Sequence, residues 1–476
     1  RTEFNLNNPN GGYAQEHPGP GCLNPGINGA DGEATLDVEW AGAAAPGAHV
    51  VAASCQDVLI FGGFLALQNI LQGAGGRPPD VVSISYGEAE VFMGASYNQY
   101  VDDLYAAAGA QGISVYVSAG DHGPDVQEYQ YGINVSGFAS TPDNVAVGGT
   151  DFEDSYLNSN GIPYSTYWNT SPTTGPPWGS ALRYIPEIPW NSSCASELLN
   201  SYLNTDEPAL CNLPNYPVLG TLWAGSGGPS ECSMGTPQVP GVGSSPGCIG
   251  WAQPNFQNNF PGITNNVRDL PDVSLFAAGG PPGGVWGHSY VFCFSDPNNG
   301  GSPCTAGAPT GWAYSGGTSF AAPIWAGIQA LLNQKINSKS GLPNNILYSL
   351  ASTPGGLYVT GQCNSNTLAP GGPNPGCIFY DVTSSNPVGG GRLYTDNDVP
   401  CQGDPNDNNT LFNCYLPSGF GYTYGVLSNS NSTYMPDYQT TAGWDFATGI
   451  GTVNVQNLVN NWPIPPVPIN CWPYLC

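Results

Sequence analysis

Ile113-Ser-Val-Tyr-Val-Ser-Ala-Gly-Asp121 decides the fold. This apolar run predicts a buried strand that ends in a turn. Similar strands are predicted at 80–87 and 144–150, and helical stretches at 59–72 and 100–110 alternate with them. Strands that alternate with helices predict a parallel sheet with helices on both faces, which places the chain in the α/β class.

Two parts of the chain depart from this alternation. Residues 151–265 are rich in Pro, Gly, Trp and Asn and contain four cysteines, so we expect long surface loops that disulfides hold in place. The last residues contain five prolines and two cysteines. The predicted organisation is one domain over residues 1–460, with the loop-rich insertion inside it, and a tail rich in Pro and Cys over residues 461–476.

Few residues are charged, and most of these are acidic. The chain has 7 Lys and Arg against 34 Asp and Glu, a formal net charge of −27. Phosphate groups and anionic lipid surfaces need basic patches, so neither nucleic acid nor a membrane is expected as a partner. Such a charge keeps a protein soluble, and it also suits an acidic environment, because protonated carboxyls no longer repel one another.

Fourteen cysteines and four histidines are present, and no Cys-x-x-Cys pair occurs. Structural zinc sites need that kind of spacing. We therefore expect disulfides formed in an oxidising compartment, and a secreted protein. No apolar run reaches the ~18 residues that a membrane span needs.

The strongest local signal for chemistry is Ser315-Gly-Gly-Thr-Ser-Phe-Ala-Ala-Pro323, where a helix is expected to begin at Thr318 or Ser319. A serine at the start of a helix holds its hydroxyl out of the core, and its own N–H is free to bind an oxyanion. Ser319 is therefore the candidate nucleophile. By itself, such a serine is more often a helix N-cap.

A serine nucleophile needs a base, and none of the histidines lies in an obvious Ser/His/Asp context. Glu33 and Asp37 are four residues apart, so on a helix they share one face. If they share a proton, one pKa rises and the pair can exchange protons in acid. Asp121 ends a predicted strand, where a protonated carboxyl could donate to an oxyanion. Taken singly, these acids are more often solvated helix residues or a turn residue.

Together these elements resemble the sedolisins, the serine-carboxyl peptidases with a subtilisin-like fold. The three motifs are Gly32-Glu-Ala-Thr-Leu-Asp37, Ser118-Ala-Gly-Asp121 and Gly317-Thr-Ser-x-x-x-Pro323. Supporting matches, in family order, are Val81-Val-Ser-Ile-Ser-Tyr-Gly87, Val147-Gly-Gly-Thr150, Pro271-Asp-Val-Ser274 and Gly443-Trp-Asp-Phe-Ala-Thr-Gly449. The resemblance implies a subtilisin-like parallel sheet flanked by helices, with long disulfide-pinned surface loops. It also implies a secreted endopeptidase that acts on proteins or peptides in acid.

The resemblance implies a role for each candidate residue. Ser319 would attack the scissile carbonyl, and Glu33 would take its proton and pass it to the leaving amine. Asp37 would position and tune Glu33. Asp121, in its protonated form, would stabilise the oxyanion together with the Ser319 N–H. A carboxylate base remains functional at a pH at which a histidine would be protonated.

The family also has a structural calcium site near its C-terminus, so one Ca²⁺ is the implied cofactor. The implied ligands are the Asp381 and Asp445 carboxylates and the backbone carbonyls of Val382, Thr441 and Gly443. All are hard oxygen ligands, as Ca²⁺ requires. The family usually has Gly where Thr441 stands, but a carbonyl ligand does not depend on the side chain.

Two alternatives remain open. One is a catalytically silent secreted structural or binding protein on the same fold, against which the four intact catalytic positions argue. The other is a conventional Ser/His/Asp peptidase that uses His122 or His288.

The start of the chain carries a further expectation. Neither an initiator Met nor a signal peptide is present, nor the large propeptide of a sedolisin zymogen, so Arg1 is interpreted as a processing boundary. Residues 1–31 are rich in Asn, Gly and Pro, and no strand is expected before the Glu33 helix. We therefore expect an N-terminal fragment of the same precursor to complete the sheet, held through a disulfide of Cys22 or Cys55.

Overall fold

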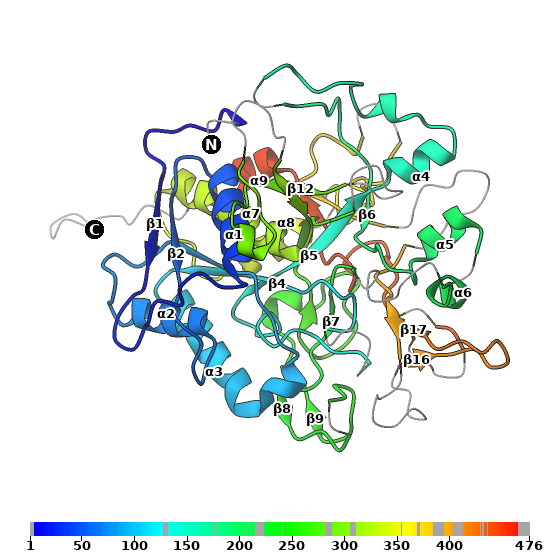
Figure 1. The fold of residues 1–476 in the computed structure, drawn as a ribbon, viewed down its shortest axis with the longest axis horizontal. Coiled ribbons are helices and arrows are strands. Elements are labelled where there is room, and N and C mark those ends of the chain that lie inside the picture. Colours follow the sequence, from blue (N-terminus) through cyan, green and yellow to red (C-terminus); the bar gives the residue numbers. More distant parts are fainter. Residues whose placement is uncertain are drawn as a thin grey trace.

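A twisted sheet with helices on both faces forms the centre of the computed structural model (Figure 1). The residues that it describes are 4–126, 132–175, 178–205, 207–214, 223–239, 241–280, 288–304, 311–353, 355–368, 372–383, 395–402, 413–428, 430, 433–435 and 437–464.

The central sheet has the strand order β11-β5-β4-β3, with all neighbours parallel, and β6 pairs antiparallel with β5 at one end. The predicted α/β fold class, with a subtilisin-like parallel sheet, is confirmed. The strands are β1 Gly12–Glu16, β2 His49–Ala53, β3 Val81–Ile84, β4 Ser114–Ser118, β5 Val145–Phe152, β6 Glu187–Pro189, β7 Gly228–Pro229, β8 Met234–Gly235, β9 Cys248–Ile249, β10 Asp269–Leu270, β11 Val273–Phe276, β12 Tyr290–Phe292, β13 Ala313–Ser315, β14 Phe379–Tyr380, β15 Pro400–Cys401, β16 Cys414–Tyr415, β17 Gly425–Leu427 and β18 Thr452–Val453.

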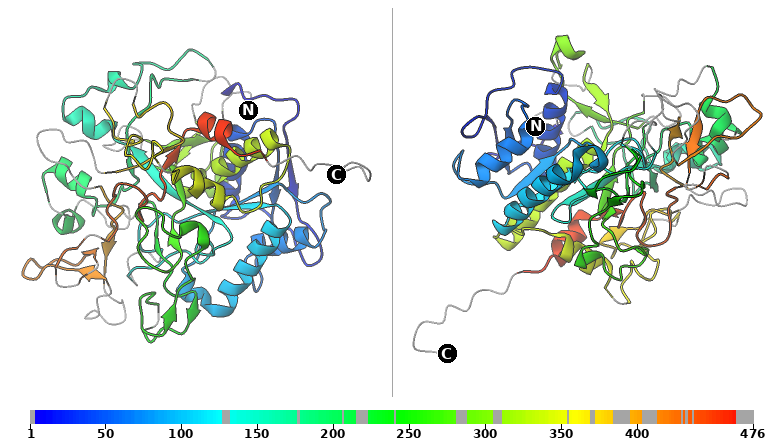
Figure 2. Two further views of the ribbon diagram at one scale, coloured as in Figure 1. Left: turned by 180° about the vertical axis from the view of Figure 1, so that it is seen from behind. Right: turned by 90° about the horizontal axis from the view of Figure 1, so that it is seen from below.

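Helices cover the sheet on both sides, as the views in Figure 2 show. On β4, Val115 and Val117 pack in one buried cluster with side chains of α2 and α3. Tyr116 points to the opposite face, where its ring stacks on Trp325 of α7. This alternation is the period of two that a strand buried on both faces requires. The helices are α1 Asp31–Ala44, α2 Gly62–Leu71, α3 Glu90–Ala110, α4 Asp154–Ser159, α5 Glu197–Leu203, α6 Glu207–Cys211, α7 Thr318–Ile336, α8 Asn344–Ala351 and α9 Val455–Asn461.

The prediction that no strand precedes the Glu33 helix is wrong. Strand β1 lies within residues 1–31 and pairs in parallel with β2, from Gly12 opposite His49 to Glu16 opposite Ala53. Its sequence, Gly-Tyr-Ala-Gln-Glu, has no apolar pattern, so the strand depends on its partner rather than on its own propensity. Cys22 and Cys55 are joined to each other, so the predicted disulfide to a second chain is also wrong.

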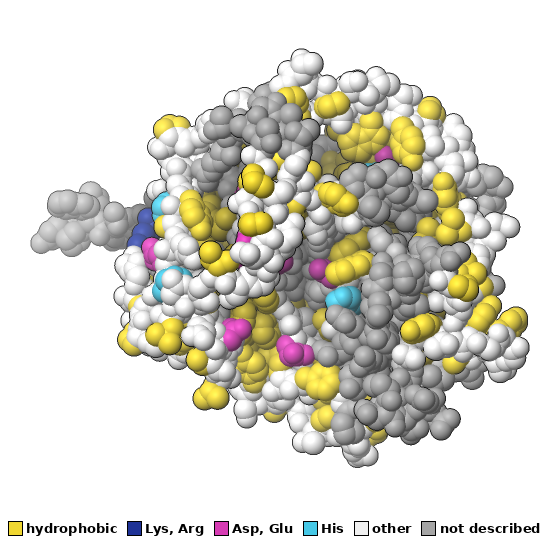
Figure 3. Space-filling model, viewed as in Figure 1, with side chains coloured by type: hydrophobic (Ala, Val, Ile, Leu, Met, Phe, Trp, Pro, Cys, Tyr) yellow, Lys and Arg dark blue, Asp and Glu magenta, His cyan; other side chains and the backbone are white. Residues whose placement is uncertain are grey.

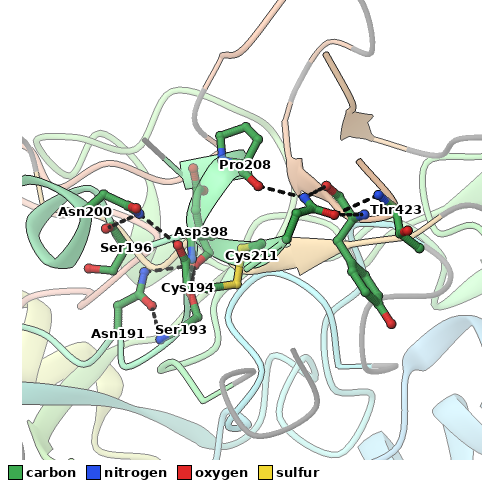
Figure 4. Close-up of a disulfide and its surroundings, with 12 residues drawn as sticks. Asn191, Ser193, Cys194, Ser196, Asn200, Pro208, Cys211, Asp398 and Thr423 are labelled. Atoms are coloured by element: carbon green, nitrogen blue, oxygen red, sulfur yellow. Dashed lines mark hydrogen bonds between the residues drawn. A yellow bond between two sulfur atoms is a disulfide. The ribbon is translucent and has the colours of Figure 1, made fainter. Parts of the chain in front are cut away.

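Residues 151–265 were predicted to be surface loops, but parts of this region are buried in the fold. Disulfides Cys194–Cys211 and Cys232–Cys248 do hold this region in place, as expected. The region nevertheless adds β6 to the central sheet and buries Trp190 almost completely. Figure 4 shows how the first disulfide is embedded: Asn191 and Ser193 beside it donate side-chain hydrogen bonds to the Asp398 carbonyl, at 2.9 Å and 2.8 Å. Hydrogen bonds across about 200 residues therefore make this insertion part of the fold.

The described cysteines all form disulfides. Besides the three named above, the pairs are Cys293–Cys304, Cys363–Cys377 and Cys401–Cys414. The other two cysteines belong to the predicted tail and lie in 465–476, outside the described residues. Within the described part of the chain, no helix has the length and apolar character needed to cross a bilayer.

Candidate active site

Helices α1 and α7 pack against each other and present Glu33, Asp37 and Ser319 to one site. Glu33 lies in the first turn of α1, and Asp37 lies one turn later on the same face. Ser319 is the second residue of α7, which begins after Gly317. Gly317 has a φ of +136°, a conformation that other residues rarely adopt, so the glycine permits the sharp entry into the helix.

The Ser319 side chain lies beside the Glu33 carboxylate. Burial, and then the nearby charge of Asp37, raise the pKa of Glu33 to about 8, and the Ser319 hydroxyl opposes part of this shift. Glu33 Oε1 is buried without a hydrogen-bond partner among the described residues. The nucleophile thus lies next to a carboxyl group that keeps its proton at a pH well above the ordinary pKa of a glutamate.

Asp37 is the second member of the pair, and Ser85 binds it from the end of β3. The Ser85 hydroxyl donates to Asp37 Oδ1 at 2.6 Å. Burial raises the pKa of Asp37 to about 7, and the bond from Ser85 lowers it only in part. Two close carboxyls with raised pKa values retain a shared proton into the neutral range.

Asp121 follows β4, and its carboxylate contacts Thr318, the first residue of α7. Its Oδ1 accepts hydrogen bonds from the Thr318 N–H at 2.7 Å and the Thr318 hydroxyl at 2.9 Å. A Cβ atom on Gly317 would lie 2.9 Å from Asp121 Oδ2 and 3.6 Å from the Ser319 Cβ. Burial raises the pKa of Asp121. Since Oδ1 accepts both Thr318 bonds, Oδ2 is the oxygen left to carry a proton, and it lies next to Gly317.

The histidines that were considered as alternative bases contact other side chains, as the distances around each ring show. His288 Nδ1 lies 2.9 Å from Asp151 Oδ1, and its Nε2 lies 2.9 Å from Asp154 Oδ1. Both ring nitrogens are thus taken by carboxylates, which raise the pKa of His288 to about 10 in spite of its burial. His122 has its ring 5.6 Å from that of Trp223. The carboxylate that lies next to the Ser319 hydroxyl is that of Glu33.

Sequence analysis missed two polar residues of this site, Ser85 and Thr318. Both lie inside motifs that were quoted, but their partners are 48 and 197 residues away. Only the fold brings these groups together. In the space-filling view, acidic side chains lie toward the hollowed middle of the face shown, whereas Lys and Arg appear at its edge (Figure 3).

The segments of the predicted calcium site lie side by side. The Gly443 N–H donates to Asp381 Oδ2 at 2.9 Å, and the Thr441 N–H donates to Asp445 Oδ2 at 3.0 Å. Asp381 Oδ1 is buried and has no hydrogen-bond partner among the described residues. Val382 is fully buried next to it. Burial and the charge of Asp445 both raise the pKa of Asp381, so two buried carboxylates stand together with no basic partner in the described part of the chain.

Comparison with known proteins shows the family to which the chain belongs. The model of the subtilase family matches residues 26–353, more than half of the chain. Kumamolisin of Bacillus sp. (strain MN-32) is 26% identical over 323 residues, which cover 68% of this chain and 43% of kumamolisin. Sedolisin of Pseudomonas sp. (strain 101) is 26% identical over 285 residues, covering 58% of this chain and 33% of that protein. The chain thus spans less than half the length of these curated relatives.

A shorter match and a solved structure complete the comparison. A probable tripeptidyl-peptidase of Trichophyton verrucosum is 40% identical over 78 residues, which are 15% of this chain and 13% of that protein. Among solved structures, Pseudomonas sedolisin, a serine-carboxyl proteinase complexed with two molecules of pseudo-iodotyrostatin, has a similar fold, with a TM-score of 0.53 and 20% identity over 94% of this chain and 83% of that chain. The chain therefore belongs to the subtilase family, and the resemblance to the sedolisins predicted from its sequence is confirmed.

Proposed function

We propose that this protein is a serine-carboxyl endopeptidase that hydrolyses peptide bonds in acid. The observation that carries the proposal is the position of the Ser319 hydroxyl beside the buried Glu33 carboxyl, with Asp37 one helical turn away from Glu33. A nucleophile, an acid–base group within hydrogen-bonding reach and a third group that orients the base are the parts that covalent hydrolysis needs.

The proposed reaction begins when the Ser319 Oγ attacks the scissile carbonyl carbon and Glu33 accepts the hydroxyl proton. The new C–O bond converts the carbonyl oxygen into an oxyanion. The proton on Asp121 Oδ2 and the Ser319 N–H, which helix geometry leaves free, donate to that oxyanion. Glu33 then gives its proton to the amide nitrogen, and the C–N bond breaks. Water releases the acyl group from Ser319 by the same steps in reverse order.

The proposal requires acid because the Glu33 and Asp37 pair must share one proton, which leaves an oxygen of the pair free to accept the Ser319 proton, and Asp121 must hold a second proton. As the pH rises through the range of the pair, with pKa values of about 7 and 8, Glu33 and Asp37 lose their shared proton and repel each other. Asp121 loses the proton that it donates to the oxyanion. A protein that is secreted into an acidic medium would also tolerate the net charge of −27, because its carboxylates are partly neutralised there.

Hydrolysis is expected to be fastest in acid and to fall at least tenfold between pH 5 and pH 9. The measurement is kcat/KM from pH 2 to pH 9, on a pool of fluorogenic decapeptides with acetylated N-termini and amidated C-termini. Blocked ends separate internal cleavage from the removal of terminal tripeptides. An optimum near pH 8, or cleavage of free N-termini alone, would contradict the acid mechanism and the endopeptidase assignment, respectively.

A bound Ca²⁺ belongs to the same proposal as a structural element. The residues fit the ion, because Asp381 brings a buried oxygen with no other partner and Asp445 a second carboxylate. The backbone carbonyls of Val382, Thr441 and Gly443 would complete an all-oxygen set. The ion would neutralise two buried carboxylates and join two loops that have little regular structure.

Removal of Ca²⁺ is expected to lower the melting temperature by ~3–4 °C, since a ligand present at 100 to 1,000 times its Kd stabilises a protein by about 3–4 kcal/mol and the unfolding entropy of 476 residues is ~1 kcal/mol/K. The measurement is thermal unfolding with EGTA and after Ca²⁺ is restored. Activity at 25 °C should fall only as far as the protein unfolds. Elemental analysis that finds no calcium in the purified protein, or a melting temperature that EGTA leaves unchanged, would overturn this assignment.

A further inference from the structure

Ser85 stands between the acid pair and the nucleophile, and the proposed reaction has so far given it no task. It follows β3 and is 6% exposed. Its Oγ lies 2.6 Å from Asp37 Oδ1 and 3.3 Å from the backbone carbonyl oxygen of Ser319. One hydroxyl therefore has two acceptors, one on each of the helices that form the site.

The Ser319 carbonyl is open to Ser85 because of Pro323. In an α-helix, the carbonyl of residue 319 would accept the N–H of residue 323. Proline has no N–H, so this position of α7 leaves the Ser319 carbonyl without its helical donor. Pro323 and Phe320 are buried here, which keeps the surroundings of that carbonyl dry.

A hydroxyl has one proton to donate and lone pairs to accept with. When Asp37 is ionised, the Ser85 proton is best placed on Asp37 Oδ1, at the shorter distance. When Asp37 is protonated, its own proton can be donated to the Ser85 Oγ, and the Ser85 proton can turn to the Ser319 carbonyl. Asp37 and Ser85 thus remain hydrogen-bonded to each other in both states, and the heavy atoms do not have to move.

We propose that Ser85 is a positioning residue, which turns its hydroxyl between Asp37 and the Ser319 carbonyl as Asp37 gains and loses a proton in each catalytic cycle. The proposal rests on the proposed function and adds to it a reason for the proline in α7. It keeps the Asp37 carboxyl hydrogen-bonded in both of its protonation states, whereas a buried carboxyl left unpaired would cost roughly 1–3 kcal/mol.

The titratable groups around Asp37 are acids or a phenol. They are Glu33 on α1 and Tyr86, whose pKa is raised by burial and by the charges of Glu33, Asp37 and Asp57. The charge of Asp121, after β4, acts on Glu33. Among the described contacts of Asp37, the Ser85 bond is the one that lowers its pKa. Loss of the Ser85 hydroxyl should therefore hold the proton on the pair more tightly.

The first test compares Ser85→Ala with Ser83→Ala and Ser85→Thr. Ser83 lies in β3, two residues before Ser85, so the two side chains point to the same side of the backbone. The buried Ser83 hydroxyl has no hydrogen-bond partner among the described residues. Ser85→Ala should lower kcat about tenfold and move the high-pH limb of the pH profile, where activity falls, up by about one unit. Ser83→Ala should leave both unchanged, and Ser85→Thr should restore the position of the limb.

The second test uses Pro323→Ala, which supplies the missing N–H to the Ser319 carbonyl. That N–H competes with Ser85, so Asp37 should lose its proton more readily and the pH profile should move down. The same change made in Ser85→Ala should have no effect on the profile. Circular dichroism and melting temperatures establish that each variant is folded.

The outcomes separate this inference from the proposed function. If the unaltered protein hydrolyses no peptide at any pH, the proposed function is wrong and the inference falls with it. If the protein is active and Ser85→Ala has the pH profile of Ser83→Ala, the inference alone is overturned. An equal shift by Pro323→Ala with and without the Ser85 hydroxyl would also overturn it.

Discussion

Ser319→Ala and Glu33→Gln are each expected to lower kcat/KM by at least about 1,000-fold at the optimum pH. The alanine variant lacks the atom that bonds to the substrate carbonyl. The glutamine variant keeps the size of Glu33 but can neither accept the hydroxyl proton nor pass one to the leaving amine. Because the two residues act in one step, the double variant should be no slower than the slower single variant. Initial rates on the blocked decapeptides measure all three.

Glu39→Gln is the matched control for Glu33→Gln. Glu39 lies six residues later on the same helix, and its carboxylate accepts the Cys293 N–H at 3.0 Å, away from the nucleophile. A rate within about threefold of the unaltered protein is expected for this control. A Glu33→Gln variant as active as Glu39→Gln would exclude Glu33 as the base.

Asp121→Ala is expected to lower kcat about 100- to 1,000-fold with little change in KM, because it removes a donor that acts on the oxyanion. Asp121→Asn should retain much more activity. Its amide oxygen can accept the two Thr318 bonds, which leaves its NH₂ group at the place of Oδ2. An amide does not ionise, so the Asn variant should lose less activity than the unaltered protein as the pH rises above neutrality.

This pair of variants distinguishes a donor from a purely structural residue. Melting temperatures of Asp121→Ala and Asp121→Asn show whether either variant is destabilised. If the Asn variant is as slow as the Ala variant while both are folded, the role of Asp121 as oxyanion donor is contradicted.

The local positions of the site could be predicted from the sequence. Glu33 and Asp37 are one helical turn apart, and Ser319 follows two glycines at the start of a helix. Asp121 follows a strand whose residues alternate between two buried faces. Each of these patterns is set by neighbours within a few residues, which is the range over which helical and strand periodicity act.

The features that could not be predicted depend on distant parts of the chain. Strand β1 has no apolar pattern and forms through the pairing of Gly12–Glu16 with β2. Ser85 and Thr318 hold Asp37 and Asp121 through bonds that only the folded sheet creates. The burial of Trp190 in the loop-rich insertion depends likewise on contacts that composition does not reveal.

The central claim is that Ser319 attacks the substrate carbonyl and that Asp121 receives the resulting oxyanion. A crystal structure with a bound peptide aldehyde at the pH of maximal activity tests it most directly, since an aldehyde forms a stable hemiacetal with a nucleophilic hydroxyl. We expect a covalent bond from Ser319 Oγ to the aldehyde carbon, with the hemiacetal oxygen within hydrogen-bonding distance of Asp121 Oδ2 and the Ser319 N–H. An aldehyde that inhibits hydrolysis but is bonded to another residue, or to none, would contradict these roles of Ser319 and Asp121.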